Sequence, residues 1–452
     1  MQPSNITQKI RNALGAAGSA KSRRWSLNVL FSTADQGLFS GANFLGAILL
    51  AKSVSPEEYG AYSVGFAIYL LFTSFYTSLV LEPVSVLGWN LSSALGTVKY
   101  LYRLGLFHLA LTIPLLIGVV ASSFFAARLR PVLLAMAVVL PFALLIWGIR
   151  RVAYVYTKPL AACVCSGVYC ISLLGAMQLL RSRGYLNAPS FFGCMGFAAI
   201  VAAVPGLTVA LRHSPDQPVL SQSSPLAKQG LFSQHWNFGK WLVISSFMTT
   251  VSAQAQFLIS AAFLDLKSAG VLRAMMNFTL PPLQVIQAVS ILALPPMSRK
   301  FDSGDHRDFL RMGHIVTLGL TGGTLLFEVI LFLFRSNLSS LAYGDKYPGY
   351  SLLIPVLGLL AVMQALGSYS LVMRAMRRPQ ATLYIAGASL LCVLALTAPA
   401  TKLFGVYGTA VSTIISYAAA AAVSYYLAKR YVAAELSIVP DSVSKLAVAS
   451  PE

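Results

Sequence analysis

The chain has 452 residues, of which 57% are hydrophobic and only 10% are charged. Soluble domains carry about 25% charged residues, so this composition excludes a soluble single-domain fold and indicates an all-α integral membrane protein. The formal net charge is +19. Because the basic residues mostly flank apolar stretches, they indicate membrane topology and not nucleic-acid binding.

Twelve stretches are apolar enough to cross a membrane, since a spanning helix needs about 20 apolar residues. They cover roughly 27–51, 62–87, 104–125, 130–150, 159–181, 187–211, 239–264, 270–297, 312–334, 350–373, 380–400 and 405–428. Most of the 33 Lys and Arg residues fall on the side of the N-terminus. Positive residues favour the cytosolic side, so both termini are expected in the cytosol.

The connection 212–236 is rich in Pro and Ser, which predicts a flexible cytosolic linker between two halves of six helices each. The expected domains are therefore a cytosolic basic tail, an N-terminal six-helix bundle, the linker, a C-terminal six-helix bundle and a cytosolic tail, at 1–24, 25–211, 212–236, 237–430 and 431–452. Halves of six helices share one orientation, so a pseudo-two-fold axis along the membrane normal is expected to relate them.

The first stretch keeps a polar face inside the hydrocarbon region. Ser32, Gln36, Ser40 and Asn43 recur at helical spacing, and Asp35 lies beside them. A charge in the membrane costs at least ~2.5–3.5 kcal/mol, so Asp35 is expected to be paired or hydrated. It is a candidate for ion or proton coupling.

The second half of the chain repeats this unit, which indicates an internal duplication. Ala42-Asn43-Phe44-Leu45 corresponds to Ala255-Gln256-Phe257-Leu258. Each segment ends a long apolar helix and is followed by a short turn and a glycine, Gly60 or Gly270.

Polar faces on the first, second, seventh and eighth stretches predict a hydrated substrate cavity. Its candidate residues are Gln36, Asn43, Tyr69, Tyr76, Thr249, Gln256, Arg273, Asn277 and Gln284. Glu82 joins Asp35 as a candidate for ion or proton coupling. Small polar residues also hold helices together, so for each of these residues a structural role stays open beside the functional one.

No set of residues suggests catalysis or a bound metal. Paired carboxylates, metal-ligand spacings and nucleophile–base sets are not found in convincing form, and only five histidines are present. The five cysteines lie in apolar stretches, which is typical of buried hydrophobic residues. The chain is expected to be neither an enzyme nor dependent on a cofactor.

Several short motifs are spread along nearly the whole chain. They are Leu50-Ala51-Lys52, Ser55-Pro56-Glu57-Glu58-Tyr59-Gly60-Ala61-Tyr62, Gly270-Val271-Leu272-Arg273, Leu294-Pro295-Pro296-Met297-Ser298-Arg299, Tyr343-Gly344-Asp345-Lys346-Tyr347 and Phe404-Gly405-Val406-Tyr407-Gly408-Thr409-Ala410. Together they resemble the motifs of bacterial polysaccharide and O-antigen flippases of the Wzx type, in the multidrug/oligosaccharidyl-lipid/polysaccharide exporter superfamily.

The resemblance implies two six-helix bundles around a cleft in the bacterial inner membrane. It also implies alternating-access flipping of an undecaprenyl-diphosphate-linked oligosaccharide, with Arg273 receiving the diphosphate and with polymerase and export proteins as partners beside the membrane lipids. The first helix carries Ala34-Asp35 where the similar lipid II flippases have an Arg-Asp pair. That difference favours an exopolysaccharide, capsule or O-antigen unit over lipid II.

Three rival interpretations of the sequence stand beside this one. A drug or organic-cation antiporter of the same superfamily is compatible with Asp35. A membrane glycosyltransferase, polymerase or ligase is disfavoured because the sequence has no long extracytosolic loop. A major facilitator transporter is disfavoured because Gly88-Trp89-Asn90-Leu91-Ser92 lacks that family's charged loop.

Overall fold

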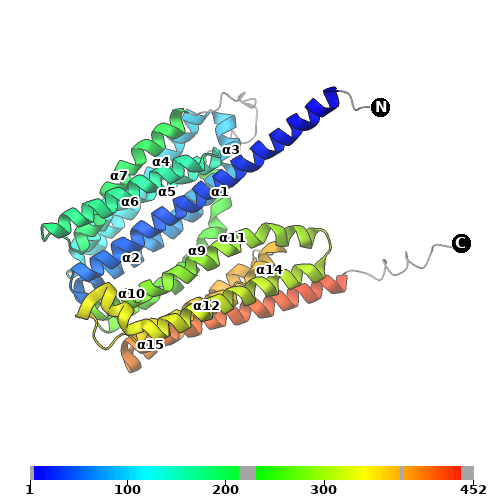
Figure 1. The fold of residues 1–452 in the computed structure, drawn as a ribbon. Helices are drawn as coiled ribbons and strands as arrows, with labels where there is room; N and C mark the ends of the chain where they lie inside the picture. The colour runs from blue at the N-terminus through cyan, green and yellow to red at the C-terminus, as the bar shows by residue number, and fades with distance from the viewer. Residues whose placement is uncertain (1–4, 213–230, 377, 379, 439–452) are drawn as a thin grey trace. The chain divides into compact units, whose positions relative to one another are not determined.

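The computed structural model describes residues 5–212, 231–376, 378 and 380–438, and in these ranges all regular secondary structure is helical (Figure 1). Ten helices in the described ranges are long and apolar enough to cross a membrane. The prediction of an all-α membrane protein is confirmed, and the chain is a multi-pass membrane protein.

The difference between ten and the twelve predicted stretches comes from two helices. Helix α15 (Gln380–Ile438) runs through the last two stretches and bends at Gly405, whose φ is 60° and ψ is −141°. Helix α1 (Asn5–Ser53) is not among the ten. Its polar face, which includes Asp35, Gln36 and Asn43, lowers its mean hydropathy.

The chain divides into two compact units that do not follow the sequence halves. The first unit takes the residues up to Ser53 together with Phe72–Val243, and the second takes Val54–Leu71 together with the residues from Ile244 onward. Two helices are therefore shared between the units. They are α2 (Pro56–Tyr76) and α9 (Leu231–Phe263).

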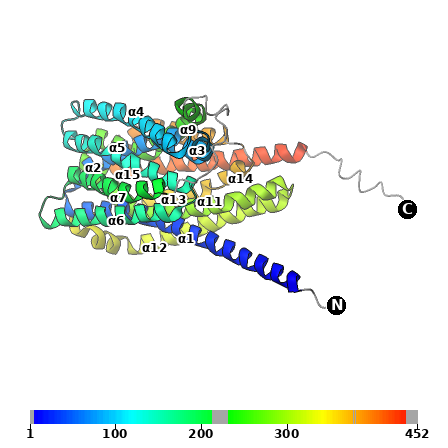
Figure 2. The ribbon, with the colours of Figure 1, turned by 90° about the horizontal axis from the view of Figure 1, so that it is seen from above.

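In the first unit, α1 packs along α6, α5 packs along α7, and α6 also packs on α7 (Figure 2). The bounds are α3 Glu82–Leu95, α4 Thr97–Ser123, α5 Arg130–Val155, α6 Pro159–Ser182 and α7 Ala188–Arg212. Glycines allow close contact here: a Cβ on Gly196 of α7 would lie 2.8 Å from a methyl of Val139 on α5.

A π-helical turn (Thr77–Leu81) joins α2 to α3, where the sequence predicted one uninterrupted stretch. The first turns of α9 pack against it. A Cβ on Gly239 would lie 2.5 Å from the carbonyl oxygen of Ser78, and Nδ1 of His235 lies 3.0 Å from the carbonyl oxygen of Leu79. The irregular backbone at this turn therefore has α9 as its partner.

In the second unit, α12 packs along α13, and α13 packs along α15. Buried side chains around Met297, Phe309 and Val372 form its core. The remaining bounds are α10 Leu266–Met276, a 3₁₀ turn Asn277–Thr279, α11 Leu280–Asp302, α12 His306–Tyr343, a 3₁₀ turn Gly344–Lys346, α13 Leu353–Gly367 and α14 Ser370–Ala375.

The observed bounds differ from the predicted domains in three places. Val54–Leu71 packs in the second unit although it lies inside the predicted bundle 25–211. Helix α9 already begins at Leu231, inside the predicted linker, and residues 213–230 of that linker lie outside the described ranges. Helix α15 continues to Ile438, inside the predicted C-terminal tail.

Candidate functional site

A buried ion pair lies inside the first unit. Asp35 of α1 is 0% exposed, and its carboxylate accepts hydrogen bonds from Nε and NH2 of Arg150 on α5, at 2.9 and 2.8 Å. The hydroxyls of Tyr154, at 2.6 Å, and of Ser166 also donate to this carboxylate. We call these four residues the Asp35 cluster. Two parallel hydrogen bonds from a guanidinium compensate the desolvation cost of a buried carboxylate.

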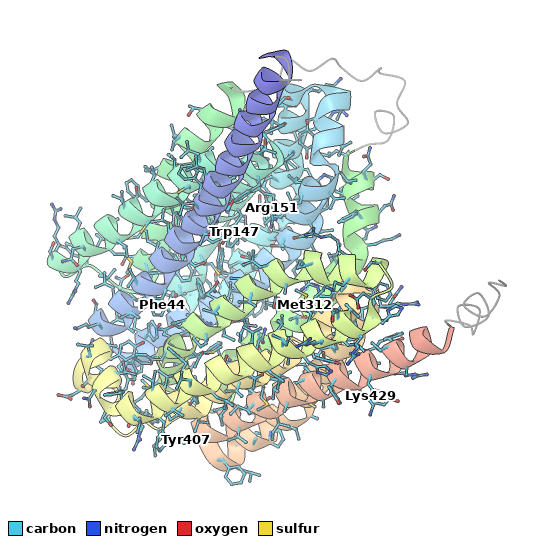
Figure 3. All side chains as sticks on the ribbon, turned by 45° about the vertical axis from the view of Figure 1, so that its right-hand side comes forward. Phe44, Trp147, Arg151, Met312, Tyr407 and Lys429 are labelled. Carbon is cyan, nitrogen blue, oxygen red and sulfur yellow. The ribbon has the colours of Figure 1, made fainter. Side chains whose placement is uncertain are left out.

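Aromatic rings extend the Asp35 cluster along α1. The guanidinium of Arg150 lies 4.1 Å from the ring centre of Phe39 and 5.4 Å from that of Trp147, which is labelled in Figure 3. Phe39 stacks on Tyr169, whose hydroxyl donates to Oδ1 of Asn43 at 3.1 Å. The polar face of α1 at Asp35 and Asn43 is thus packed against α5 and α6.

The second unit contains a buried cation for which the described residues supply no counter-ion. Arg273 of α10 is only 9% exposed, and its NH2 donates to Oε1 of Gln254 at 3.1 Å and to the carbonyl oxygen of Ser63 at 3.4 Å. The guanidinium lies 3.6 Å from the ring centre of Phe257 and 5.5 Å from that of Phe66. In the described ranges its Nε has no hydrogen-bond partner and no carboxylate forms an ion pair with it.

Next to Arg273 along the chain, Asn277 connects two tyrosines. Its Nδ2 donates to the hydroxyl of Tyr59 at 3.0 Å and to that of Tyr343 at 3.2 Å. The hydroxyl of Tyr343 in turn donates to the carbonyl oxygen of Ala274 at 2.8 Å. We call Arg273, Gln254, Phe257, Asn277, Tyr59 and Tyr343 the Arg273 cluster.

Helix α2 covers the Arg273 cluster with one face. Tyr59, Ser63 and Phe66 follow one another at helical spacing, and all three contact the cluster. Helices α2 and α10 come together closely because Gly60 and Gly270 have no side chains: a Cβ on Gly60 would collide with the carbonyl oxygen of Leu266, and one on Gly270 with that of Pro56.

The two helix starts that meet there are built alike. The hydroxyl of Ser55 accepts from the backbone N–H of Glu58 at 3.2 Å, and the carboxylate of Asp265 accepts from that of Ser268 at 2.6 Å. Such side-chain caps satisfy the free N–H groups of a first helical turn. The repeat expected from the sequence therefore corresponds to two capped helix starts that cross at their glycines.

The other predicted site residues are distributed over both units. Gln36, Thr249 and Gln284 are exposed, whereas Gln256 is 1% exposed and its Nε2 donates to the carbonyl oxygen of Ala253 and to the sulfur of Met276. Tyr69 is buried with its ring 5.6 Å from Phe66.

In the first unit, Tyr76 is buried and its hydroxyl lies 3.0 Å from Nδ1 of His108. The side chain of Glu82 is 39% exposed and lies 3.8 Å from Arg151. The structure therefore brings together Arg273 with Asn277 and, separately, Asp35 with Asn43.

Arg150, Tyr154 and Ser166 are the members of the Asp35 cluster that the sequence did not predict. Arg150 ends the predicted stretch 130–150, where the positive-inside rule treats a basic residue as a flanking charge. Two signals were available. An acid within the membrane needs a counter-ion, and Arg150 and Tyr154 lie one helical turn apart, so both can reach the same carboxylate.

Comparison with known proteins adds evidence from structure. No family model matches the chain, and no curated protein matches it. Among solved structures, it is similar to an inward-facing multidrug resistance MATE family transporter of the MOP superfamily, with a TM-score of 0.68, 13% identity, and coverage of 90% of this chain and 96% of that one.

Two further solved structures show the same likeness. The lipid II flippase MurJ in its inward closed conformation has a TM-score of 0.63 and 16% identity, over 89% of this chain and 87% of that one. An outward-facing MATE family transporter has a TM-score of 0.58 and 12% identity, over 92% of this chain and 96% of that one. At these identities the likeness establishes the fold, which is the one shared by these transporters and this flippase.

Proposed function

We propose that the protein is a flippase of the bacterial inner membrane. It moves an undecaprenyl-diphosphate-linked oligosaccharide from the cytosolic to the periplasmic leaflet by alternating access, for exopolysaccharide, capsule or O-antigen synthesis. The observation that carries the proposal is Arg273, a buried guanidinium without a carboxylate partner among the described residues. The fold shared with a lipid II flippase supports the same class of cargo.

The contacts of Arg273 keep it in place without neutralising it. A desolvated cation–π contact contributes about 2 kcal/mol, and a hydrogen bond to a charged group about 1.5–3 kcal/mol. The face of Phe257 and the amide oxygen of Gln254 supply one of each. Together they offset the cost of insertion, at least ~2.5–3.5 kcal/mol, but leave the full positive charge available to an anion. A diphosphate is a bidentate partner for a guanidinium.

Access to Arg273 requires movement of α2. Ser63 and Phe66 contact the guanidinium, and Tyr59 bonds Asn277 beside it. In the proposed cycle, displacement of this face of α2 opens the cation to the diphosphate and frees amide and hydroxyl groups for polar parts of the cargo. Asn277, Tyr59 and Tyr343 are the groups that this movement would release.

The second candidate function is a drug or organic-cation antiporter. Two observations favour it: the fold likeness to MATE transporters and the buried carboxylate of Asp35. Against it, both oxygens of Asp35 already accept from Arg150. Proton or cation coupling at this acid would first have to break a bidentate ion pair.

The proposal is tested on the purified protein in vesicles, with a fluorescent undecaprenyl-diphosphate oligosaccharide whose leaflet is read by a membrane-impermeant quencher. Arg273→Gln should lower the flipping rate at least about tenfold, and Arg273→Lys should retain part of it because an ammonium binds phosphate as a point charge. Arg335→Gln is the matched control, since its guanidinium donates to the carbonyl oxygen of Phe332 on its own helix. An unchanged rate in Arg273→Gln at equal protein level contradicts the proposal.

A further inference from the structure

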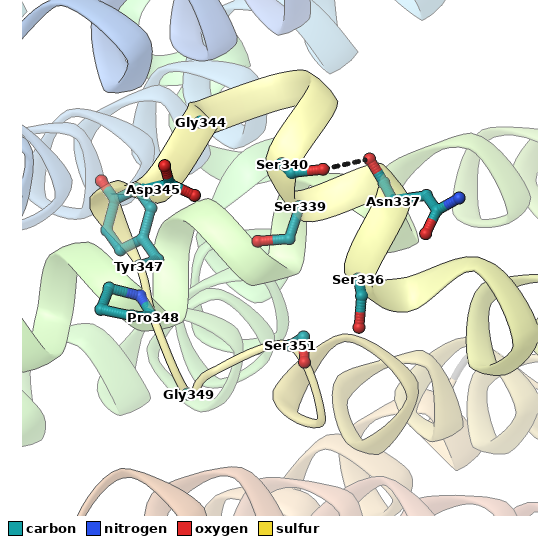
Figure 4. Close-up of a pocket in the computed structure, with 10 residues that line it drawn as sticks. All are labelled: Ser336, Asn337, Ser339, Ser340, Gly344, Asp345, Tyr347, Pro348, Gly349 and Ser351. Carbon is teal, nitrogen blue, oxygen red and sulfur yellow. Dashed lines mark hydrogen bonds between the residues drawn. The ribbon is translucent and has the colours of Figure 1, made fainter.

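A polar hollow lies at the end of α12 in the second unit (Figure 4). Its volume is about 300 Å³, and it lies between the last turns of α12, the 3₁₀ turn Gly344–Lys346 and the segment leading to Ser351. Side chains that line it include Ser336, Asn337, Ser339, Asp345, Tyr347 and Ser351. The hollow shares no residue with the two clusters described above, although the ring of its Tyr347 packs edge-on against that of Tyr343, at 5.3 Å between ring centres.

Three hydroxyls of the hollow have no hydrogen-bond partner among the described residues. Several helical serines of this unit donate back to their own helix, as Ser290 does to the carbonyl oxygen of Ile286 at 2.7 Å. Ser340 at the edge of the hollow does the same toward Asn337, at 3.1 Å. Among the described residues, Ser336, Ser339 and Ser351 make no such bond. Their hydroxyls are free to bind a ligand as donors and acceptors.

The charge of the hollow selects against anions. Asp345 is the one charged residue among those that line it, and among the described residues it has no ion-pair partner. A free carboxylate accepts hydrogen bonds from hydroxyl or ammonium groups and repels phosphate and carboxylate. Tyr347 and Pro348 lie on the same side of the hollow as Asp345 and supply an apolar wall facing the serines (Figure 4). Hydroxyls, one carboxylate and an apolar wall together suit a sugar ring.

The hollow lies where a sugar would be hydrated. Helix α12 has 38 residues, so it is about 57 Å long, nearly twice the roughly 30 Å of the hydrocarbon layer. Its final turns, which carry Ser336 and Ser339, directly follow Arg335 and an apolar stretch. They are therefore at the polar boundary of the membrane and not inside it.

We infer that this hollow is a subsite for one neutral or amino-bearing sugar ring. Ligand pockets run from about 300 Å³ upward, so the hollow holds a single ring and not an oligosaccharide. The inference rests on the proposed function only for the source of the sugar, a unit of the lipid-linked oligosaccharide. The site itself follows from the free hydroxyls of Ser336, Ser339 and Ser351 and the carboxylate of Asp345.

The test is saturation-transfer NMR on the full-length protein in detergent, with titration to obtain Kd. The probes are methyl glucoside, methyl glucosaminide, methyl glucuronide and glycerol 1-phosphate. A ligand of this size should bind the hollow with a Kd of roughly 1 mM if it is the neutral or the amino sugar. The glucuronide and glycerol phosphate should bind at least about tenfold more weakly.

Variants of the lining residues test whether the sugar binds in the hollow. Asp345→Asn and the double variant Ser336→Ala/Ser339→Ala should each raise the Kd for methyl glucoside at least about fivefold, whereas Ser290→Ala should leave it unchanged. Equal binding of glycerol phosphate, which would indicate a lipid headgroup site, overturns the inference. So does sugar binding that neither variant weakens, or no sugar binding. Sugar binding without flipping would remove the proposed function alone, and flipping without sugar binding would remove this subsite alone.

Discussion

Gly60 and Gly270 hold the same position in two helices, the fifth residue of α2 and of α10, and each faces the first residue of the other helix. The contact is reciprocal: Gly60 lies against the carbonyl oxygen of Leu266, and Gly270 against that of Pro56. Eight residues into each helix the relationship continues, since Arg273 donates to the carbonyl oxygen of Ser63. The repeat predicted from the sequence thus corresponds to a local two-fold crossing beside the Arg273 cluster.

Gly60→Ala and Gly270→Ala should each destabilise the protein by about 1–3 kcal/mol, because the new Cβ meets backbone that cannot rotate away. The measurement is thermal unfolding in detergent. Gly322→Ala on α12 is the matched control, since a Cβ there meets nothing within 4 Å, and alanine should be neutral or slightly stabilising there. Unfolding temperatures that do not distinguish the three variants would show that the helices do not cross at these glycines.

Asp35→Asn or Arg150→Met should cost about 3–5 kcal/mol, because each leaves the other member of a buried ion pair uncompensated. The double variant should recover a large part of that loss, which a double-mutant cycle measures. Arg151→Gln serves as control: its side chain is 35% exposed and lies 3.8 Å from Glu82, so its effect should stay within about 0.5 kcal/mol.

The Asp35→Asn variant also distinguishes a structural role of Asp35 from a role in ion or proton coupling. If the variant is as stable as the wild type but has lost gradient-driven transport, Asp35 carries protons or cations, and the antiporter function is favoured. If stability falls and transport per folded molecule persists, Asp35 is a structural partner of Arg150.

Tyr343→Phe should destabilise the second unit by about 1–3 kcal/mol. The change removes the hydroxyl that accepts from Asn277 and donates to the carbonyl oxygen of Ala274. Tyr347→Phe is a close control, because the buried hydroxyl of Tyr347 has no hydrogen-bond partner among the described residues and its loss should be neutral or stabilising. Chemical denaturation of both variants measures the difference. Equal stability would mean that the Tyr343 hydroxyl bonds do not stabilise the fold.

Acid should remove a cap from α12. The ammonium of Lys300 and the N–H of Asp308 bind the carboxylate of Asp305 and hold its pKa below its ordinary value of 3.8. A depressed folded-state pKa gives stability that is present above 3.8 and lost as pH falls through the folded-state pKa. The stability difference between the wild type and Asp305→Asn should therefore be positive at neutral pH and shrink in that acidic window. A stability difference that does not change with pH would contradict the role of the Asp305 carboxylate as a cap.

Helical periodicity predicted the spanning stretches and placed Asp35 and Arg273 on polar faces, because a 3.6-residue repeat fixes which residues share a face. It did not identify what each face meets. Arg150 has a partner 115 positions away in sequence, and no local pattern encodes such a pairing. Gln36 shares a face with the half-buried Asn43, and Gln284 shares one with the buried Asn277, yet both glutamines are exposed.

The sequence also did not predict that Val54–Leu71 belongs to the second unit. The glycines Gly60 and Gly270 were visible as repeat partners, but their mutual contact depends on how the two helices approach one another. The π-helical turn after Tyr76 could not be predicted either, because its five residues include no proline or other local break. In the structure this turn packs against Gly239.

The most direct test of the central proposal measures two cargoes in the same vesicles. The purified protein is reconstituted with fluorescent undecaprenyl-diphosphate oligosaccharide, and uptake of a small fluorescent organic cation is followed in parallel, with and without a proton or sodium gradient. The proposal predicts movement of the glycolipid between leaflets, sensitive to Arg273→Gln, and no cation uptake. Cation uptake with a stationary glycolipid would contradict the proposal and establish the antiporter alternative.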